Sequence, residues 1–126
     1  MRLDAASRVT VKGDRELLRS AIENIVRNAI PHTPSQSVVG LDVRGDTHVA
    51  VVEVTDSGPG VDDGALKRIF EPFFRSGETK GAGLGLAIAR KFVELHRGTI
   101  CAENKPAGGL SVRVRLPLDI PAATRA

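Results

Sequence analysis

Two apolar stripes at helical spacing constrain the fold of this chain more than any other feature. The first follows Gly13 and Asp14, a predicted N-cap, and its members are Leu18, Ala21, Ile22, Ile25 and Ala29. The second is closed by Gly98, and its members are Leu84, Ile88, Phe92 and Leu95. Each helix must bury its stripe against another layer, which the rest of the chain has to supply.

Alternating apolar and polar residues predict that this second layer is a β-sheet. Residues 38–44 and 48–56 flank a turn signal at Gly45-Asp46 and predict an antiparallel hairpin. The other predicted elements are strands at 8–12, 99–103 and 111–116 and a short helix at 62–69. We therefore predict an α+β two-layer sandwich, in which three helices cover one face of a mixed sheet of about five strands. Residues 1–117 are predicted to form the domain and residues 118–126 a C-terminal tail.

Composition argues against several classes of function. The chain has 126 residues, 41% hydrophobic and 26% charged, as expected for one globular domain. It contains no apolar run of the roughly 18 residues that a membrane span needs, and no signal-peptide pattern follows Met1. The net charge is +3, but the basic residues are scattered and the only aromatics are four Phe, which argues against nucleic-acid binding. The single Cys101 cannot form an intrachain disulfide and is more typical of a small core residue than of a reactive thiol.

Asn24 and Asn28 lie four residues apart on the first predicted helix, so they share a face with Arg27, away from the apolar stripe. An amide oxygen suits Mg²⁺, which prefers hard oxygen ligands and keeps several waters when it also binds phosphate. Two surface asparagines would give the same pattern, so this pair alone leaves both interpretations open.

Asp56 ends a predicted buried strand and is followed by Gly58 and Gly60. An acceptor-only carboxylate at this place can receive a hydrogen bond from the exocyclic amine of adenine. The glycines allow positive φ and let the backbone pass close to a flat ring. An ordinary Asp-Ser-Gly turn is the alternative for this segment taken alone.

Gly81, Gly83 and Gly85 precede the second helix, and glycine-rich amides at a helix N-terminus form a phosphate site. Their spacing matches neither a Rossmann fingerprint nor a Walker A loop, and a flexible loop capping the helix is the alternative. Just before this loop, Phe70, Phe73 and Phe74 form a local hydrophobic plug or a hinge around Pro72. Arg75 follows and could reach a phosphate, or be an ordinary solvated side chain.

Taken together and in this order, the four motifs resemble the ATP-binding catalytic domain of two-component sensor histidine kinases. The resemblance runs from about Asp14 to Pro117. Residues 23–29 match the family's N box, residues 56–60 its first glycine box, residues 70–74 its F box and residues 83–86 its second glycine box. Gly108-Gly109 before the last predicted strand is also typical of the family.

The resemblance implies a Bergerat-type fold that binds ATP and Mg²⁺. Asn28 would hold the magnesium, Asn24 would line the phosphate site, and Asp56 would bind adenine in a pocket lined by Gly58 and Gly60. The remaining residues implied at the nucleotide are His32, Phe70, Arg75, Gly81, Gly83, Leu84, Gly85 and Leu86. Asn24, Asn28 and Arg75 are the implied catalytic residues, and residues 76–82 the lid.

The chain departs from the family pattern at two places. Pro31 stands where a basic residue is frequent, although His32 occupies the next place, where Tyr or His is common. Ala82 stands where Thr is usual, which removes a hydroxyl from the phosphate loop.

The resemblance also separates phosphoryl transfer from ATP hydrolysis. The related hydrolytic ATPases place a Glu four residues before the magnesium Asn, as general base for water. Here that position is Asn24, and Glu23 lies on a different face. We therefore expect a histidine protein kinase domain that transfers the γ-phosphate to a protein.

Neither His32, His48 nor His96 stands in a family-like phosphoacceptor context. The resemblance therefore implies a fragment that needs the helical dimerisation and phosphoacceptor domain of the same kinase, with a response regulator downstream. It implies a cytoplasmic domain without direct membrane contact, whose parent is anchored in the inner membrane. Two alternatives stay open: a serine kinase of the anti-sigma type, and a degenerate module that binds its partner without turnover.

Overall fold

The computed structural model describes residues 11, 13–29, 39–45, 48–74, 84–106 and 108–118. These residues form the helices α1 (Arg15–Ala29) and α2 (Gly85–Leu95), the short 3-10 helices η2 (Asp63–Ala65) and η3 (Arg68–Phe70), and the strands β1 (Gly40–Gly45), β2 (Val49–Thr55), β3 (Thr99–Asn104) and β4 (Leu110–Pro117). Within this part of the chain, no helix is long and apolar enough to cross a membrane.

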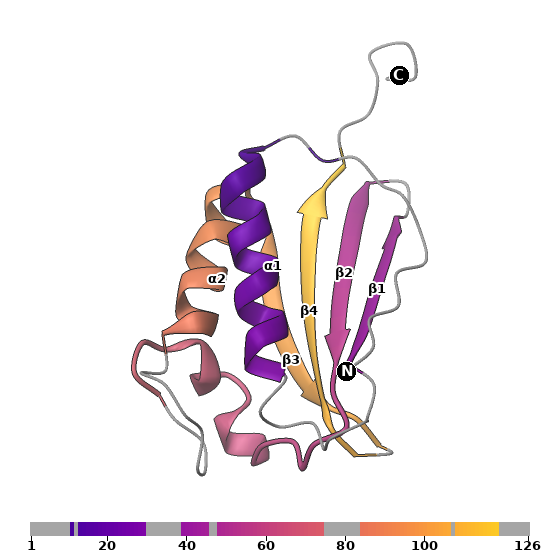
Figure 1. The fold of residues 1–126 in the computed structure, drawn as a ribbon, viewed down its shortest axis with the longest axis vertical. Coiled ribbons are helices and arrows are strands. Elements are labelled where there is room, and N and C mark those ends of the chain that lie inside the picture. The colour runs from indigo at the N-terminus through magenta and orange to yellow at the C-terminus, as the bar shows by residue number, and fades with distance from the viewer. Residues whose placement is uncertain are drawn as a thin grey trace.

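The strands form one sheet in the order β1-β2-β4-β3, and α1 and α2 cover one of its faces (Figure 1). The α+β two-layer arrangement is thereby confirmed, and the predicted hairpin is formed by β1 and β2. All three strand pairs are antiparallel, so the prediction of a mixed sheet was wrong for the described strands. Hairpin connections allow this, because no helical crossover joins two neighbouring strands.

The predicted fifth strand and third helix are not confirmed. Most of residues 8–12 lie outside the described residues, and Val11 forms only an isolated bridge with Leu118. The segment at 62–69 forms η2 and η3, two separate 3-10 turns rather than one α-helix. Its hydrogen bonds run between residues three apart, from Ala65 N–H to the Asp62 carbonyl and from Glu71 N–H to the Arg68 carbonyl.

The core lies between the helices and the sheet. Its buried members are Ala21, Ile25, Ala29, Val39, Val52, Val54, Ile69, Phe70, Leu86, Ala89, Val93, Leu110, Val112, Val114 and Leu116. On α1 the predicted stripe is confirmed at Ala21, Ile25 and Ala29. The N-cap is confirmed too, because Asp14 Oδ1 accepts the N–H groups of Glu16 and Leu17 at 2.9 and 3.0 Å.

The buried face of α2 differs from the predicted one. Leu86, Ala89 and Val93 are buried. Of the predicted stripe, Phe92 is partly buried and packs against the core, whereas Ile88 is 38% and Leu95 62% exposed. Apolar residues occur on more than one side of this helix, so periodicity alone did not single out the side that packs. The side with the small residue Ala89 packs inward, which suits close contact with the neighbouring α1.

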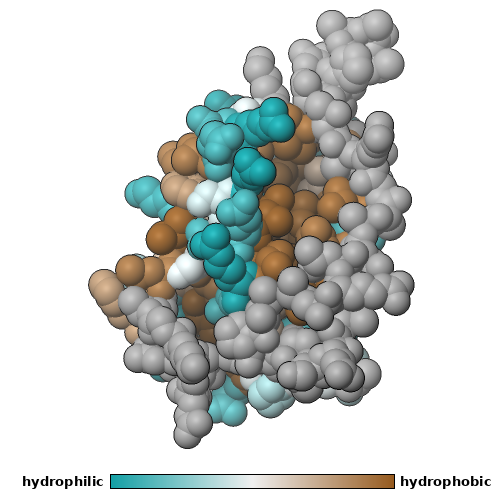
Figure 2. Space-filling view, in the orientation of Figure 1, coloured by the Kyte–Doolittle hydropathy of each residue, from teal (hydrophilic) through white to brown (hydrophobic). Residues whose placement is uncertain are grey.

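The outward face of α1 is charged. Glu23 forms ion pairs with Arg19 at 3.4 Å and Arg27 at 3.8 Å, and all three side chains are largely exposed. Figure 2 shows this hydrophilic ridge running down the molecule with hydrophobic surface on both sides.

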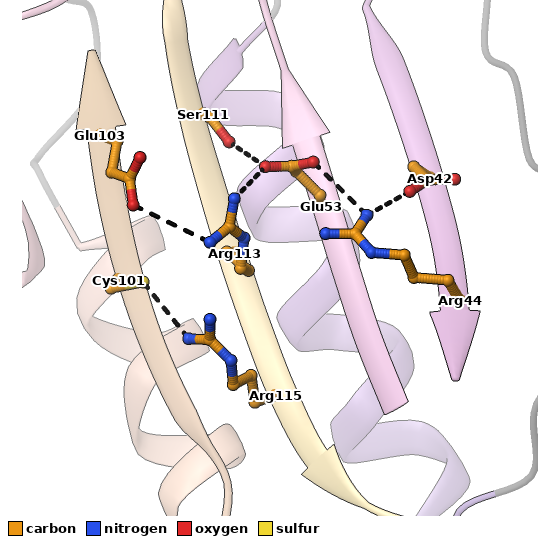
Figure 3. A network of polar contacts seen from close by, with 8 residues as sticks. All are labelled: Asp42, Arg44, Glu53, Cys101, Glu103, Ser111, Arg113 and Arg115. Carbon is orange, nitrogen blue, oxygen red and sulfur yellow. Dashed lines mark hydrogen bonds and ion pairs between the residues drawn. The ribbon is translucent and has the colours of Figure 1, made fainter. Parts of the chain in front are cut away.

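A polar network covers the sheet face that carries no helix (Figure 3). At its centre Glu53 accepts hydrogen bonds from the Ser111 hydroxyl at 2.7 Å and from Arg113 at 2.9 Å. The Ser111 hydrogen bond, together with Arg113, holds the pKa of Glu53 below its ordinary value despite partial burial. Cys101 is half-buried on this face beside Arg115, rather than in the core as predicted.

Candidate functional site

The predicted site motifs come together at one end of the molecule. The last turns of α1 with Asn24 and Asn28, the end of β2 before Asp56, η2 and η3, and the first turn of α2 all lie at the lower end of Figure 1. This follows from the antiparallel packing of α1 on α2, which places the end of one helix beside the start of the other.

Asp56 is a buried carboxylate, with only 3% of its surface exposed. Its Oδ1 accepts the backbone N–H groups of Gly58 at 2.9 Å and Leu110 at 3.0 Å. Its own N–H donates to the Leu110 carbonyl at 3.0 Å. Both side-chain bonds end on Oδ1, and the described part of the chain offers Oδ2 no donor. A carboxylate fixed in this way presents a rigid acceptor to a ligand.

The loop after Asp56 passes close to the β3–β4 turn. Gly60 has φ of +74°, and a Cβ there would lie 2.4 Å from Oδ1 of Asn104. The positive φ predicted for this loop is therefore found at Gly60, while Gly58 contributes its N–H. Gly109 has φ of +95°, and a Cβ there would lie 2.1 Å from the Asp56 carbonyl oxygen. A residue with a Cβ would be strained at either place, and at Gly109 it would also overlap the backbone of Asp56.

Asn24 lies beside the start of α2. A Cβ on Gly85 would be 3.8 Å from the Asn24 carbonyl oxygen and 3.9 Å from its Oδ1. Leu84 is the N-cap residue of α2 and makes no side-chain capping bond. The first N–H groups of a helix lack partners within the helix and carry the positive end of its dipole, so this terminus favours an anion. Asn28 is half-buried one turn further along α1, on the same side as Asn24.

The phenylalanine motif divides into a buried and an exposed part. Phe70 is 6% exposed and belongs to the core, as does the side chain of Leu86. Phe73 is 69% exposed with φ of +65°, while Phe74 is half-buried under the Arg68 guanidinium, 4.8 Å from the ring centre. The Phe70 side chain thus fits the local hydrophobic plug, and the Leu86 side chain belongs to the same core.

Four predicted site residues, His32, Arg75, Gly81 and Gly83, lie outside the described residues, as does the predicted lid at 76–82. Conversely, sequence reasoning assigned no role to Asn104, Gly109 and Leu110, which contact the Asp56 loop. The Gly108-Gly109 pair was the one signal that pointed to this turn.

Comparison with known proteins confirms the resemblance. Residues 13–120 match the model of the family described as "Histidine kinase-, DNA gyrase B-, and HSP90-like ATPase". Sensor histidine kinase CpxA of Escherichia coli (strain K12) is 41% identical over 111 residues, which are 84% of this chain and 24% of that protein. The chain thus spans about a quarter of the length of this relative.

Solved structures of sensor histidine kinases also resemble this chain. The mycobacterial sensor histidine kinase MprB has a TM-score of 0.84 at 32% identity, covering 94% of this chain and 86% of that one. Full-length ShkA, solved in complex with AMPPNP, has a TM-score of 0.79 at 28% identity, covering 98% of this chain and 27% of that one.

Proposed function

Because the chain belongs to the family of histidine kinase-, DNA gyrase B- and HSP90-like ATPases, we propose that it binds ATP and Mg²⁺ as the catalytic domain of a sensor histidine kinase. The domain presents the γ-phosphate to a histidine on a separate helical dimerisation domain of the same kinase, and a response regulator acts downstream. The observation that carries the proposal is the buried Asp56 carboxylate, held by two backbone amides at the end where α2 begins.

Asp56 reads the base in this proposal. Oδ1 is engaged by the N–H groups of Gly58 and Leu110, so Oδ2 accepts from the exocyclic amine of adenine. A base that offers an acceptor at this position, as guanine does with its carbonyl oxygen, is repelled by the same carboxylate. Gly58 and Gly60 line the pocket, since backbone without side chains lets the flat ring approach.

The phosphates lie at the start of α2, against the N–H groups of Leu84, Gly85 and Leu86. The donor set on α1 fits a magnesium–phosphate complex, because amide oxygens are hard, neutral ligands. Asn28 would hold the ion and Asn24, beside Gly85, lines the phosphate site. When bound, magnesium would neutralise part of the negative charge of the phosphates. The other proposed nucleotide contacts are His32, Phe70, Arg75, Gly81 and Gly83. The proposed domain comprises residues 1–117.

Transfer to a protein fits the site better than hydrolysis. The residue four places before Asn28 is Asn24, an amide that cannot act as a general base at neutral pH. Glu23 forms its ion pairs with Arg19 and Arg27 on the outward face of α1. No carboxylate of α1 therefore stands where it would activate a water at the phosphates.

The acceptor comes from outside the described residues. His48 precedes β2 at the end of the sheet opposite to Asp56. His96 follows α2 at the end opposite to Gly85, and its ring is hydrogen-bonded to Asp14 and Phe92. Neither histidine can meet a γ-phosphate held at the start of α2. In this proposal a partner domain supplies the imidazole, and the chain is a cytoplasmic catalytic part of a longer, membrane-anchored sensor.

Calorimetric titration with ATP, with and without Mg²⁺, tests the proposal. We expect saturable binding by the chain, weakened about tenfold or more in Asp56→Asn, since a hydrogen bond to a charged partner is lost. Asn28→Ala should lose the Mg²⁺ enhancement and keep the Mg²⁺-independent binding. Asp42→Asn makes the same chemical change on the open face of the sheet and serves as control.

Absence of ATP binding by the folded wild-type chain would contradict the proposal and favour the degenerate module. Efficient ATP hydrolysis that disappears in Asn24→Ala would contradict phosphoryl transfer. Phosphorylation of a serine-bearing partner instead of a histidine-bearing one would favour the anti-sigma type of kinase.

A further inference from the structure

We propose that Asn104, the last residue of β3, is a positioning residue that holds the loop of the base pocket in its ligand-ready conformation. The inference rests on the proposed function, because it assigns the Asp56 loop to adenine recognition. Asn104 itself does not touch the base; it acts through the backbone of Val61.

The Asn104 side chain pairs with Val61 as a second peptide group would. Its Oδ1 accepts the Val61 N–H at 3.0 Å, and its Nδ2 donates to the Val61 carbonyl at 2.5 Å. The orientation of the amide is fixed chemically, because the Val61 N–H can only donate and its carbonyl can only accept. Nδ2 also donates to Oδ1 of Asp63, in the first turn of η2, at 3.1 Å. A carboxamide satisfies all three partners at once.

The two ends of the loop of the base pocket, residues 56–61, are therefore anchored on one hairpin, formed by β3 and β4. Asp56, at the start of the loop, exchanges hydrogen bonds with Leu110 on β4. Val61, at its end, is bound by Asn104 on β3. Asn104 and Leu110 are register partners across the β3–β4 pair. The turn between them is closed by bonds from Lys105 N–H to Gly109 and from Gly108 N–H to Lys105.

This double anchoring fixes the position of Asp56 before a ligand arrives. A loop already held in the bound geometry loses less conformational freedom on binding, which raises affinity. The close packing at Gly60, where a Cβ would lie 2.4 Å from Asn104 Oδ1, leaves the segment little room to shift. Without the hydrogen bonds from Asn104 to Val61, one end of the loop would be free to move. The Asp56 carboxylate would then be held less precisely and would distinguish adenine from guanine less well.

The experiment measures ATP and GTP affinity of the chain, with urea unfolding measured in parallel. Asn104→Asp removes the donor to Val61 and sets a carboxylate beside Asp63. We expect ATP affinity to fall about tenfold with a smaller change for GTP, because the part-buried hydrogen bond to Val61 and the exposed one to Asp63 are both lost. The Mg²⁺ enhancement should remain, since Asn24, Asn28 and α2 are untouched. Asn104→Ala removes the hydrogen bonds to Val61 and Asp63 without adding charge, and it should also lower ATP affinity more than GTP affinity.

Glu103→Gln is the matched control. Glu103 is the preceding residue of β3, and its side chain faces Arg113 at 3.8 Å on the open face of the sheet. This variant should keep both affinities. Asp63→Asn combined with Asn104→Asp should recover part of the ATP affinity, because an amide at 63 can donate to the new carboxylate.

The outcomes separate this inference from the proposed function. ATP binding that is lost in Asp56→Asn but unchanged in both Asn104 variants would overturn the inference alone. Equal losses of ATP and GTP affinity that track the loss of stability would reduce Asn104 to a structural residue and also overturn it. A folded wild-type chain that binds no ATP would overturn both.

Discussion

The backbone N–H of Asp14 donates a 2.8 Å hydrogen bond to Nε2 of His96, which joins the start of α1 to the end of α2. The other ring nitrogen, Nδ1, lies 2.7 Å from the Phe92 carbonyl. The ring therefore carries its proton on Nδ1 and accepts at Nε2. This contact closes the helix pair at the end opposite to the proposed nucleotide site.

Gly13→Ala should destabilise the chain because its new methyl group would overlap the His96 ring. A Cβ on residue 13 would lie 2.1 Å from Cδ2 of His96 and 3.2 Å from Leu18. The ring is held by two hydrogen bonds, so it cannot move without losing one. We expect a loss of about 1–3 kcal/mol in the free energy of unfolding, measured by urea titration. Gly64→Ala is the control, since nothing lies within 4 Å of its Cβ, and an equal loss there would refute the steric explanation.

Gly109→Ala should cost more than Gly108→Ala, although both residues have positive φ. At Gly108 a Cβ meets nothing within 4 Å, so we expect only the left-handed backbone cost of about 1–2 kcal/mol. At Gly109 a Cβ would lie 2.1 Å from the carbonyl oxygen of Asp56, whose N–H and Oδ1 are both hydrogen-bonded to Leu110 of β4. Gly109→Ala should therefore lower the free energy of unfolding by more than about 3 kcal/mol. The variant should also bind ATP more weakly, because the displaced residue is Asp56. Equal unfolding free energies for the two variants would contradict the packing at Asp56.

The two sides of α2 should respond differently to truncation. Val93 is 1% exposed, so Val93→Ala should cost about 1–3 kcal/mol through the cavity it leaves. Leu95 is 62% exposed, and Leu95→Ala should change stability by less than about 0.5 kcal/mol. Thermal or urea unfolding of both variants measures the difference. A larger loss of stability in Leu95→Ala would mean that the side of α2 predicted from periodicity is the buried one.

Glu53 should make the chain more stable at neutral than at acidic pH. Its pKa is lowered in the folded state, first by the Ser111 hydrogen bond and then by Arg113. A depressed carboxyl pKa adds stability above the ordinary value of 4.5, and this stability is lost as pH falls through the folded-state pKa. Glu53→Gln should therefore cost about 1–3 kcal/mol at pH 7 and progressively less below pH 4.5.

Urea unfolding between pH 7 and pH 3 measures this difference. Glu103 is 66% exposed, so Glu103→Gln should leave the pH profile close to that of the wild type. A Glu53→Gln deficit that stays constant over the whole range would assign the effect to packing instead of charge.

The sequence predicted the elements whose signals are local. The Asp14 cap, the alternating β1–β2 hairpin and the stripe on α1 are set by residues a few positions apart, and each was found. The buried side of α2 was missed because Leu86 and Leu95 are equally apolar, and only packing against α1 distinguishes them. Strand direction was missed for a similar reason, since it depends on connections that periodicity does not encode.

The candidate site was predictable where it consists of motifs. Asn24, Asp56 and Gly85 each stand in a short pattern, and the fold brings them to one end. Asn104 and Leu110 were not predictable, because their contacts with Val61 and Asp56 span 43 and 54 residues. A single asparagine at the end of a strand carries no local sign of the partner it will meet.

Asp56 and Leu110 extend the β2–β4 ladder by one position: the Asp56 N–H donates to the Leu110 carbonyl, and the Leu110 N–H donates to Oδ1 of the Asp56 side chain. Both amide protons are therefore hydrogen-bonded at a buried position, and they exchange when this end of the β2–β4 pair opens. Their hydrogen exchange should be slow and should measure the free energy of opening this end of the strand pair. The proposed base-binding carboxylate is thus attached to the central strands of the sheet, while the far end of its loop depends on the side chain of Asn104.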